Sequence, residues 1–568
     1  MEKIKNIYKE KTDLINLLII SVLIIVGSLL FHGCFNGILT DKGREMLFPA
    51  AILDGKILYK DILCIYFPLA FQINAIGYKL FGINVQTLEM FNTINALITC
   101  SALYFITREF LSKNFAFLFA VLTAVGATFN GTLFNLQLPY SCSFTYGISA
   151  YLIALFLLIK YLKTDNVKFL PYCYLIAGFS VACKSEFGIF MVILLLTTFV
   201  VKPCSIKQNI MNILVSLIFP VISFGILFLQ GVSINDLINS FNFMRKFFTT
   251  DSMIYHISKT GGIFRIGDFN MYFEYIPKAI GLYLVSYFLF KKTKDTFWVI
   301  LAITVSACLA NFTNIGMNTL LLPLTVLAVL LFKATDIYSD KPLFILILAA
   351  LGLNLRMFWA LVLSTYGIHT AHILLLAFVV LLFKYLPEYK YLSKDDLKQF
   401  TKYMLIVYLV FFGVFTIWQQ TRNDTPIITP RGMIQIPRKE ADVLTYAINY
   451  INQFSSPKSK ILVLPEGMAI NFLTQRDLDY KLPMADRLYY DAIGAEKIIE
   501  SIKNTDYEMI LIAHGHGLTN FGKPFVYSDG NPVYEFIKNN YKLDWETQYF
   551  NRADKADTNT MQCFVKPY

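Results

Sequence analysis

The sequence is 568 residues long, 56% hydrophobic and only 16% charged. Such a composition excludes an ordinary soluble domain and is typical of a protein that crosses a membrane many times. The net charge of +11 does not indicate a nucleic-acid partner, because the basic residues fall mostly in short segments between apolar runs. The nine cysteines include no CxxC pair. Cys34 and Cys64 can pair with each other or pack singly as small apolar residues.

The first apolar segment, residues 14–31, follows a basic N-terminus and is too long for the core of a signal peptide. We interpret it as an uncleaved transmembrane helix with its N-terminus in the cytoplasm. Apolar segments that cross, or nearly cross, a hydrocarbon core of ~30 Å recur as far as residue 420. They predict a membrane domain over residues 1–420 with about thirteen helices, at 14–31, 86–107, 114–134, 144–162, 169–183, 187–201, 209–230, 273–290, 296–312, 317–332, 342–363, 370–385 and 402–420.

Residues 36–82, between the first two of these helices, form a loop in which charged residues are concentrated. Four acids and four bases lie within a short stretch: Asp41, Glu45, Asp54, Asp61, Lys42, Arg44, Lys56 and Lys60. Beside a bilayer, such a loop can bring a carboxylate and a phosphate ligand to one interfacial site. Asp41 suits either a general base or the N-cap of a helix over residues 42–53, and Glu45 is compatible with both.

The distribution of Lys and Arg predicts the orientation. With the N-terminus inside, the cytoplasmic segments carry most of these residues, as the positive-inside rule requires. Two external segments break the rule: the first loop, and the long loop 231–272 with Arg245, Lys246, Lys259 and Arg265. Both are therefore candidates for function, and in this orientation they share the external face with residues 421–568.

Several ionisable residues lie within or beside the later apolar segments, where they are costly without a partner or a task. Lys184 and Glu186 either pair with each other to close a helical hairpin, or Lys184 faces the phosphate of a lipid. Arg356 either grips a phosphate or extends to the membrane surface. His369 and His372 either line an acceptor cavity or are ordinary interfacial histidines.

Residues 421–568 differ in kind, because charge rises and the long apolar runs stop. Segments 460–467 and 507–517 read as buried strands, preceded by helical patterns at 438–453 and 493–504. They predict an external soluble α/β domain with a small parallel or mixed sheet. His514 and His516 have no third ligand in the sequence and are better explained as a polar loop than as a metal site. The D-x-D of Asp477 and Asp479 is discounted for lack of a nucleotide-sugar fold.

Several short patterns follow one another along the chain. They are GKILYKD (55–61), PLAFQINAIGYKLFG (68–82), LPYS (138–141), AGFSVACKSEFGIF (177–190) and RMFWALVLSTYGIH (356–369). In this order they resemble the GT-C integral-membrane glycosyltransferases, in particular the bacterial protein O-mannosyltransferase and lipid A aminoarabinose transferase families. GKILYKD is similar to the family's G-x-x-x-Y-x-D turn, and the Pro-Leu segment to its juxtamembrane helix.

The resemblance implies an inverting transfer of a monosaccharide from a polyprenyl-phosphate carrier, with a catalytic carboxylate in the first external loop. Asp41 takes that position; Lys42 stands where paired-acid members carry a second acid, so Glu45 is only a helper. The departing phosphate is expected to be supported by Lys184, Arg356, Lys60 and Arg44. The substrate cavity is expected to include Asp61, Tyr66, Tyr140, Glu186, Tyr366 and His369.

The acceptor is expected to be a lipid, a cell-wall glycan or a protein, and the location the cell membrane. Members of the superfamily differ in whether they need a divalent metal, so no cofactor is assigned. A lipid-linked glycan transporter or flippase is the main alternative, although the charge gathers at one face and the halves show no repeat. A membrane-anchored binding protein leaves the charged first loop unexplained, and the WWDYG motif of oligosaccharyltransferases is absent.

Overall fold

The structure, a computed structural model, describes residues 2–34, 37, 39–40, 42–260, 269–302, 316–355, 367–388, 392–513, 527–549 and 559–567. Six residues singled out in the sequence lie outside these ranges: Asp41, Arg265, Arg356, Tyr366, His514 and His516.

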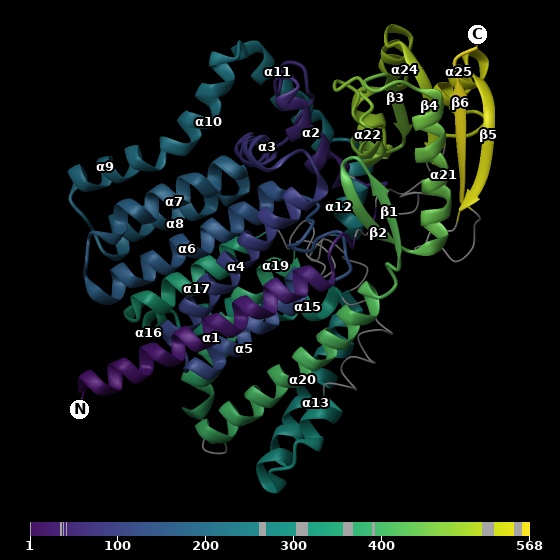
Figure 1. Cartoon of the computed structure of the whole chain (residues 1–568). Helices are drawn as coiled ribbons and strands as arrows, with labels where there is room; N and C mark the ends of the chain where they lie inside the picture. Colours follow the sequence, from purple (N-terminus) through teal and green to yellow (C-terminus); the bar gives the residue numbers. More distant parts are fainter. Residues whose placement is uncertain are drawn as a thin grey trace.

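The chain up to Gln420 is mostly helical (Figure 1). Short π-helical or 3-10 segments extend or join some of the helices, namely η1 (Ala124–Thr128), η2 (Ser185–Phe187), η3 (Thr197–Val201) and η5 (Leu386–Glu388). The α-helices are α1 (Glu2–Leu30), α2 (Lys42–Leu53), α3 (Leu69–Phe81), α4 (Val85–Phe110), α5 (Lys113–Thr123), α6 (Cys142–Thr164), α7 (Phe169–Cys183), α8 (Gly188–Leu196), α9 (Ile206–Ser216), α10 (Ile218–Leu229), α11 (Ile234–Phe248), α12 (Asp251–Thr260), α13 (Phe269–Thr293), α15 (Gly316–Phe332), α16 (Ala334–Ser339), α17 (Lys341–Leu353), α19 (Gly367–Tyr385) and α20 (Lys394–Gln420).

Within the described ranges, six helical segments are long and apolar enough to cross a membrane: Lys11–Leu30, Val85–Phe110, Cys142–Thr164, Ile206–Leu229, Gly367–Tyr385 and Lys394–Gln420. Shorter apolar helices accompany them, so the protein is a polytopic helical membrane protein, as the composition predicts. The expected helices at 296–312 and 342–363 fall partly outside the described residues.

Small residues let the helices of the bundle approach closely, which is how helices associate in lipid. A Cβ atom on Gly178 of α7 would lie 1.9 Å from the carbonyl oxygen of Ser216 in α9. A Cβ atom on Gly147 of α6 would lie 2.1 Å from the ring of Phe187. Helix α6 is consequently enclosed by its neighbours, and its N-terminus is held at the face of the bundle where the first loop lies.

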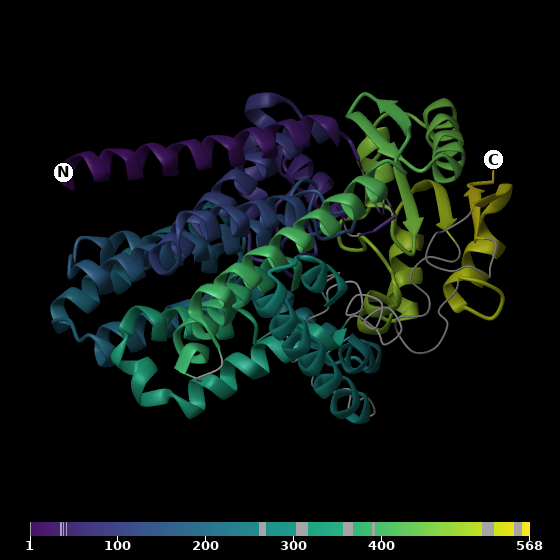
Figure 2. The ribbon, with the colours of Figure 1, turned by 90° about the horizontal axis from the view of Figure 1, so that it is seen from below.

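Beyond Gln420 the chain forms strands and short helices at one end of the molecule (Figures 1 and 2). β1 and β2 form an antiparallel hairpin, and the other strands form a mixed sheet in the order β3-β4-β6-β5, in which β3 and β4 are parallel. The elements are β1 (Thr425–Thr429), β2 (Gly432–Ile436), α21 (Arg438–Phe454), β3 (Lys460–Leu464), α22 (Met468–Thr474), α23 (Arg487–Ile493), α24 (Ala495–Asn504), β4 (Tyr507–Ala513), α25 (Pro532–Asn540), β5 (Lys542–Tyr549) and β6 (Asn559–Val565).

Helix α2 of the first loop lies between the bundle and this C-terminal region. Gly43 faces the backbone of Met468 and Ala469 so closely that a Cβ atom would lie 2.2 Å from the Ala469 nitrogen. The β1–β2 hairpin also contacts the bundle, because the Gln435 N–H donates to the Gly33 carbonyl and the Val85 N–H donates to the Arg431 carbonyl. The first loop and the C-terminal region therefore occupy the same side of the molecule, opposite the N-terminus of α1 (Figure 1).

The structure decides one open alternative and corrects one expectation. Cys34 and Cys64 are both free and buried, so they do not form a disulfide. The backbone of Cys34 pairs with that of Gln435 in β2, whereas the Cys64 thiol donates a hydrogen bond to the Tyr66 carbonyl. The segment 231–272 is not simply a loop, because it contains α11 and α12 and the start of α13. Ser233 begins α11 with a reciprocal capping box to Asp236, a local signal that the charge count did not use.

Candidate functional site

Helix α2 begins directly after Asp41 and carries three charged residues into the protein interior. Lys42, Arg44 and Glu45 are each only 2% exposed. A buried charge is tolerated only where donors, acceptors or an opposite charge replace water. The partners of these residues therefore define the site.

Glu45 joins the first loop to the bundle through one carboxylate oxygen, while its other oxygen is bonded within the loop. Arg44 Nε donates to Oε1 over 3.1 Å, and the backbone N–H of Cys142 donates to Oε2 over 3.0 Å. Cys142 is the first residue of α6, so the carboxylate lies at a helix N-terminus, where the backbone dipoles stabilise a negative charge. Burial raises the pKa of Glu45, while Arg44 and Cys142 oppose that rise.

Arg44 is enclosed by aromatic rings and a backbone carbonyl. Its guanidinium lies 4.2 Å from the ring centre of Tyr66 and 5.5 Å from that of Tyr140. Its Nη2 atom donates to the Tyr140 carbonyl oxygen over 3.2 Å. The guanidinium is thus held by Glu45 on one side and by aromatic faces on the other, which are favourable surroundings for a planar cation.

Lys184, at the end of α7, approaches the same Tyr66 ring as Arg44. It follows the last residue of α7, and its amine lies 5.9 Å from the ring centre of Tyr66 and 5.2 Å from that of Phe144. It also contacts Glu186 at 3.4 Å, longer than a close charge-assisted bond. The structure therefore contains the pairing expected between Lys184 and Glu186, and it also places Lys184 beside the Arg44 site.

The turn GKILYKD positions Tyr66. The Tyr59 hydroxyl donates to the Tyr66 carbonyl over 2.6 Å, and Asp61 accepts from the Ile57 N–H over 2.9 Å. Asp61 thus closes the turn by its own hydrogen bond. The adjacent Lys60 is exposed, and its amine lies 3.6 Å from the point where a Cβ atom on Gly231 would be, toward the start of α11.

His369 extends the cluster into the bundle. It is 7% exposed in the first turn of α19, and its ring centre is 5.6 Å from that of Phe144. It also hydrogen-bonds the backbone of Phe134, which ties α19 to the segment before α6. His372, one turn later, is similarly buried beside Gly126 of η1.

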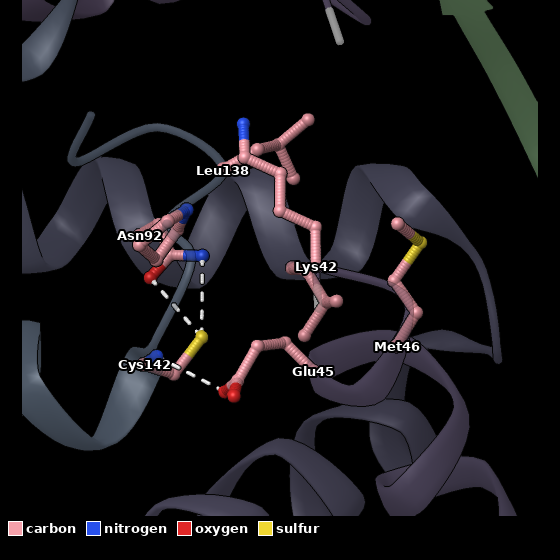
Figure 3. Close-up of a pocket in the computed structure, with 8 residues that line it drawn as sticks. Lys42, Glu45, Met46, Asn92, Leu138 and Cys142 are labelled. Atoms are coloured by element: carbon pink, nitrogen blue, oxygen red, sulfur yellow. Dashed lines mark hydrogen bonds between the residues drawn. The ribbon is translucent and has the colours of Figure 1, made fainter. Parts of the chain in front are cut away.

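On the other face of α2, a small cavity separates the first loop from α4 and α6 (Figure 3). It has room for about one water molecule. In Figure 3 the Lys42 amine points away from the Glu45 carboxylate, whereas the Glu45 carboxylate points toward Cys142. The lining residues are Lys42, Glu45, Met46, Leu88, Asn92, Leu138, Pro139 and Cys142.

The structure brings together six of the residues expected from the sequence: Glu45, Arg44, Lys184, Tyr66, Tyr140 and Glu186, with His369 reached through Phe144. Lys60 and Asp61 have the separate contacts described above. Sequence reasoning missed Phe144 and the Cys142 N–H. The Ser141 N-cap before Cys142 was the signal for a buried helix N-terminus there, because the Ser141 hydroxyl accepts from the Phe144 N–H.

A divalent metal has no obvious ligand set in the described residues, which contain no group of three or more His, Cys, Asp and Glu side chains suited to a metal ion. Asp477 and Asp479 have local structural bonds instead. Asp477 accepts from the Leu478 N–H, and Asp479 accepts from the Ser501 hydroxyl and the Lys481 N–H.

The sequence profile of the dolichyl-phosphate-mannose-protein mannosyltransferase family matches residues 67–227. This stretch includes α3 to α10 and therefore Tyr140, Phe144 and Lys184 of the site. Part of the chain thus matches a family of membrane glycosyltransferases. No curated protein matches it at a significant level.

Solved structures of membrane glycosyltransferases are similar to this chain in fold, at low sequence identity. The oligosaccharyltransferase of Archaeoglobus fulgidus, in a complex with Zn and sulfate, matches with a TM-score of 0.50 and 11% identity over 96% of this chain and 72% of its own. The oligosaccharyltransferase AglB of the same organism, in complex with an inhibitory peptide and a dolichol-phosphate, matches with a TM-score of 0.50 and 12% identity. The match covers 97% of this chain and 74% of AglB. ArnT of Cupriavidus metallidurans bound to undecaprenyl phosphate matches with a TM-score of 0.45 and 11% identity, over 97% of each chain.

The buried Lys42 predicts a pH dependence of stability. Burial lowers its pKa to about 7, whereas an unfolded lysine titrates near ~10.4. Between these values the unfolded state binds a proton that the folded state does not, so stability rises with pH by up to about 1.4 kcal/mol per unit. In detergent, Lys42→Met should melt above the wild type near pH 7, and the difference should shrink toward pH 10. Lys113→Met, at an exposed position, controls for removal of one charge; a constant difference for Lys42→Met would refute the assignment.

Proposed function

We propose that this glycosyltransferase moves a monosaccharide from a polyprenyl-phosphate carrier to an acceptor hydroxyl at the external membrane face, with inversion at the anomeric carbon. The observation that supports this most directly is the convergence of Arg44 and Lys184 on the Tyr66 ring, from the first loop and from the end of α7. Two cations from separate elements at one aromatic surface suit a phosphate whose lipid chain lies among the helices.

The carrier's phosphate leaves with its charge already present, so its departure needs electrostatic support more than a proton. Arg44 and Lys184 supply cations in a setting with little water, where such interactions are stronger than in bulk solvent. Glu186 is partly exposed and loosely paired with Lys184, so an arriving phosphate can compete for the same amine. We assign Arg356 and Lys60 to the same donor end, and Asp61, Tyr66, Tyr140, Tyr366 and His369 to the substrate cavity.

Asp41 is the proposed general base, and Glu45 is a positioning residue. Glu45 has both oxygens occupied by Arg44 and the Cys142 N–H, so it is better placed to fix Arg44 than to accept a proton from a substrate. Asp41 is the acid directly before α2 in the sequence and has the position of the catalytic acid in the first external loop of the GT-C enzymes that the chain resembles. The acceptor is a lipid, a cell-wall glycan or a protein.

The proposed orientation places the N-terminus in the cytoplasm and the C-terminal region outside. The Lys/Arg distribution supports it, and α2 and α22 share one side of the molecule. In intact cells, Asp529→Cys should react with a membrane-impermeant maleimide, because Asp529 has a side chain that is 78% exposed. Asn114→Cys, at the start of α5, should react only after permeabilisation. The opposite pattern would reverse the orientation and remove the proposed site from the external face.

Lys184 should contribute directly to donor binding. Lys184→Met keeps the apolar stem and removes the charge, so the affinity for a polyprenyl phosphate should fall roughly 10- to 100-fold, as expected for the loss of a charged hydrogen bond of about 1.5–3 kcal/mol. Glu186→Gln is the matched control, because it removes the competing carboxylate and should leave the affinity unchanged or higher. Both affinities are measured by titration of folded protein. Equal weakening by both variants would assign the pair a structural role instead.

Asp41→Asn should separate chemistry from binding. The change keeps the shape and removes the base, so sugar transfer should fall by at least ~10²-fold, the low end for a positioned base, with donor affinity and melting temperature close to wild type. Glu45→Gln should show the reverse: lower melting temperature and weaker donor binding, because breaking a buried pair costs about 3–5 kcal/mol. Near wild-type transfer by Asp41→Asn, with loss of transfer in a stable Glu45→Gln protein, would show that Glu45 is the base.

A further inference from the structure

Helix α11 presents three different faces. Phe243 and Phe247 pack on Tyr489 of α23, with ring centres 5.8 and 5.1 Å apart. A second face is polar and exposed, and consists of Asn235, Asn239, Asn242 and Lys246. The third is an exposed apolar stripe, defined as Ile234, Ile238, Phe241 and Phe248, with exposures of 68%, 49%, 44% and 50%.

The residues of this stripe recur at the spacing of a single helix face, so they form a continuous surface. Water is an unfavourable neighbour for four large apolar side chains in a row. The stripe is also distinct from the contact with α23, which uses other residues of α11. The contact with α23 therefore leaves the stripe exposed.

The position of α11 indicates which surroundings the apolar stripe contacts. Helix α10 closes the candidate span Ile206–Leu229 and exposes apolar side chains to lipid, including Val221 at 64% and Leu229 at 91%. The chain then turns at Gly231, which has a φ of +90°. Helix α11 begins three residues later and runs in a new direction toward the C-terminal region (Figure 1). It thus starts at the level where the bilayer ends.

An exposed arginine on the same face indicates the chemistry of the surface that the stripe contacts. Arg245 lies between Phe241 and Phe248 on the same face and is exposed. It has no ion pair with a carboxylate in the described part of the chain. An arginine among exposed phenylalanines matches the boundary between acyl chains and lipid phosphates, and an anionic headgroup complements its charge.

We propose that α11 lies in the surface of the outer leaflet, with its apolar stripe among the acyl chains and Arg245 on the phosphates of anionic phospholipids. The helix then fixes the height of two other parts of the protein above the membrane. It holds α23 through Tyr489, and its start lies beside Lys60 of the first loop. The lipid contact therefore sets the position of the C-terminal region relative to the bilayer. The assignment to the outer leaflet rests on the proposed orientation, whereas the lipid contact itself does not depend on the proposed transfer reaction.

The test uses the full chain in nanodiscs and nitroxide labels on two neighbouring positions. Phe241→Cys probes the stripe, and Asn239→Cys is the matched control on the polar face. The label at 241 should be accessible to oxygen and protected from a water-soluble nickel complex, and the label at 239 should show the reverse. Water exposure at both positions would overturn the proposal. Spin–spin broadening at 241 would overturn it in favour of contact with a second copy of the chain.

The role of Arg245 is tested with the same label. In discs of phosphatidylcholine with phosphatidylglycerol, the label at 241 should lie deeper than in phosphatidylcholine alone, because a cation near an anionic surface favours binding roughly fivefold. Arg245→Gln should remove this dependence on lipid charge and keep the contrast between positions 241 and 239. An unchanged dependence in Arg245→Gln would refute the headgroup contact.

Discussion

A carboxylate that is taken out of water must be given donors in exchange, and at Glu45 this requirement organises the centre of the molecule. The donors are the neighbouring Arg44 and the first backbone N–H of α6, which come from opposite sides of a boundary between loop and bundle. Loss of either donor leaves one oxygen of a buried carboxylate without its partner, which is destabilising. The requirement therefore fixes α2 against the N-terminus of α6.

The cations of the site depend on the same arrangement. Arg44 is oriented by Glu45, and Tyr66 is oriented by the turn that Tyr59 and Asp61 close. Lys184 reaches the Tyr66 ring from the end of α7, whose position depends on the contact between Gly178 and Ser216. The site is thus assembled from elements that are each held by a different contact, and aromatic faces provide their common surface.

Local signals in the sequence predicted the local parts of this arrangement. The helix over 42–53 followed from Asp41 as a candidate N-cap, and the pairing of Lys184 with Glu186 from their spacing. The contact between Glu45 and Cys142 joins residues 97 positions apart, and no periodicity reports such a distance. Of the two alternatives for Cys34 and Cys64, the structure contains single packing and no disulfide between them, because each cysteine contacts a different segment. Helix α11 was not predicted, because the segment was interpreted from its basic residues and not from the capping box of Ser233 and Asp236.

The close fit of Gly43 against Met468 and Ala469 has a consequence for folding during synthesis of the chain. The partner of α2 lies more than 400 residues later in the chain. At typical rates of synthesis the first loop waits on the order of 20–85 s before α22 leaves the ribosome. During that interval one face of a helix with buried charges has no cover. The first loop is made early, but its packing can be completed only after α22 has been synthesised.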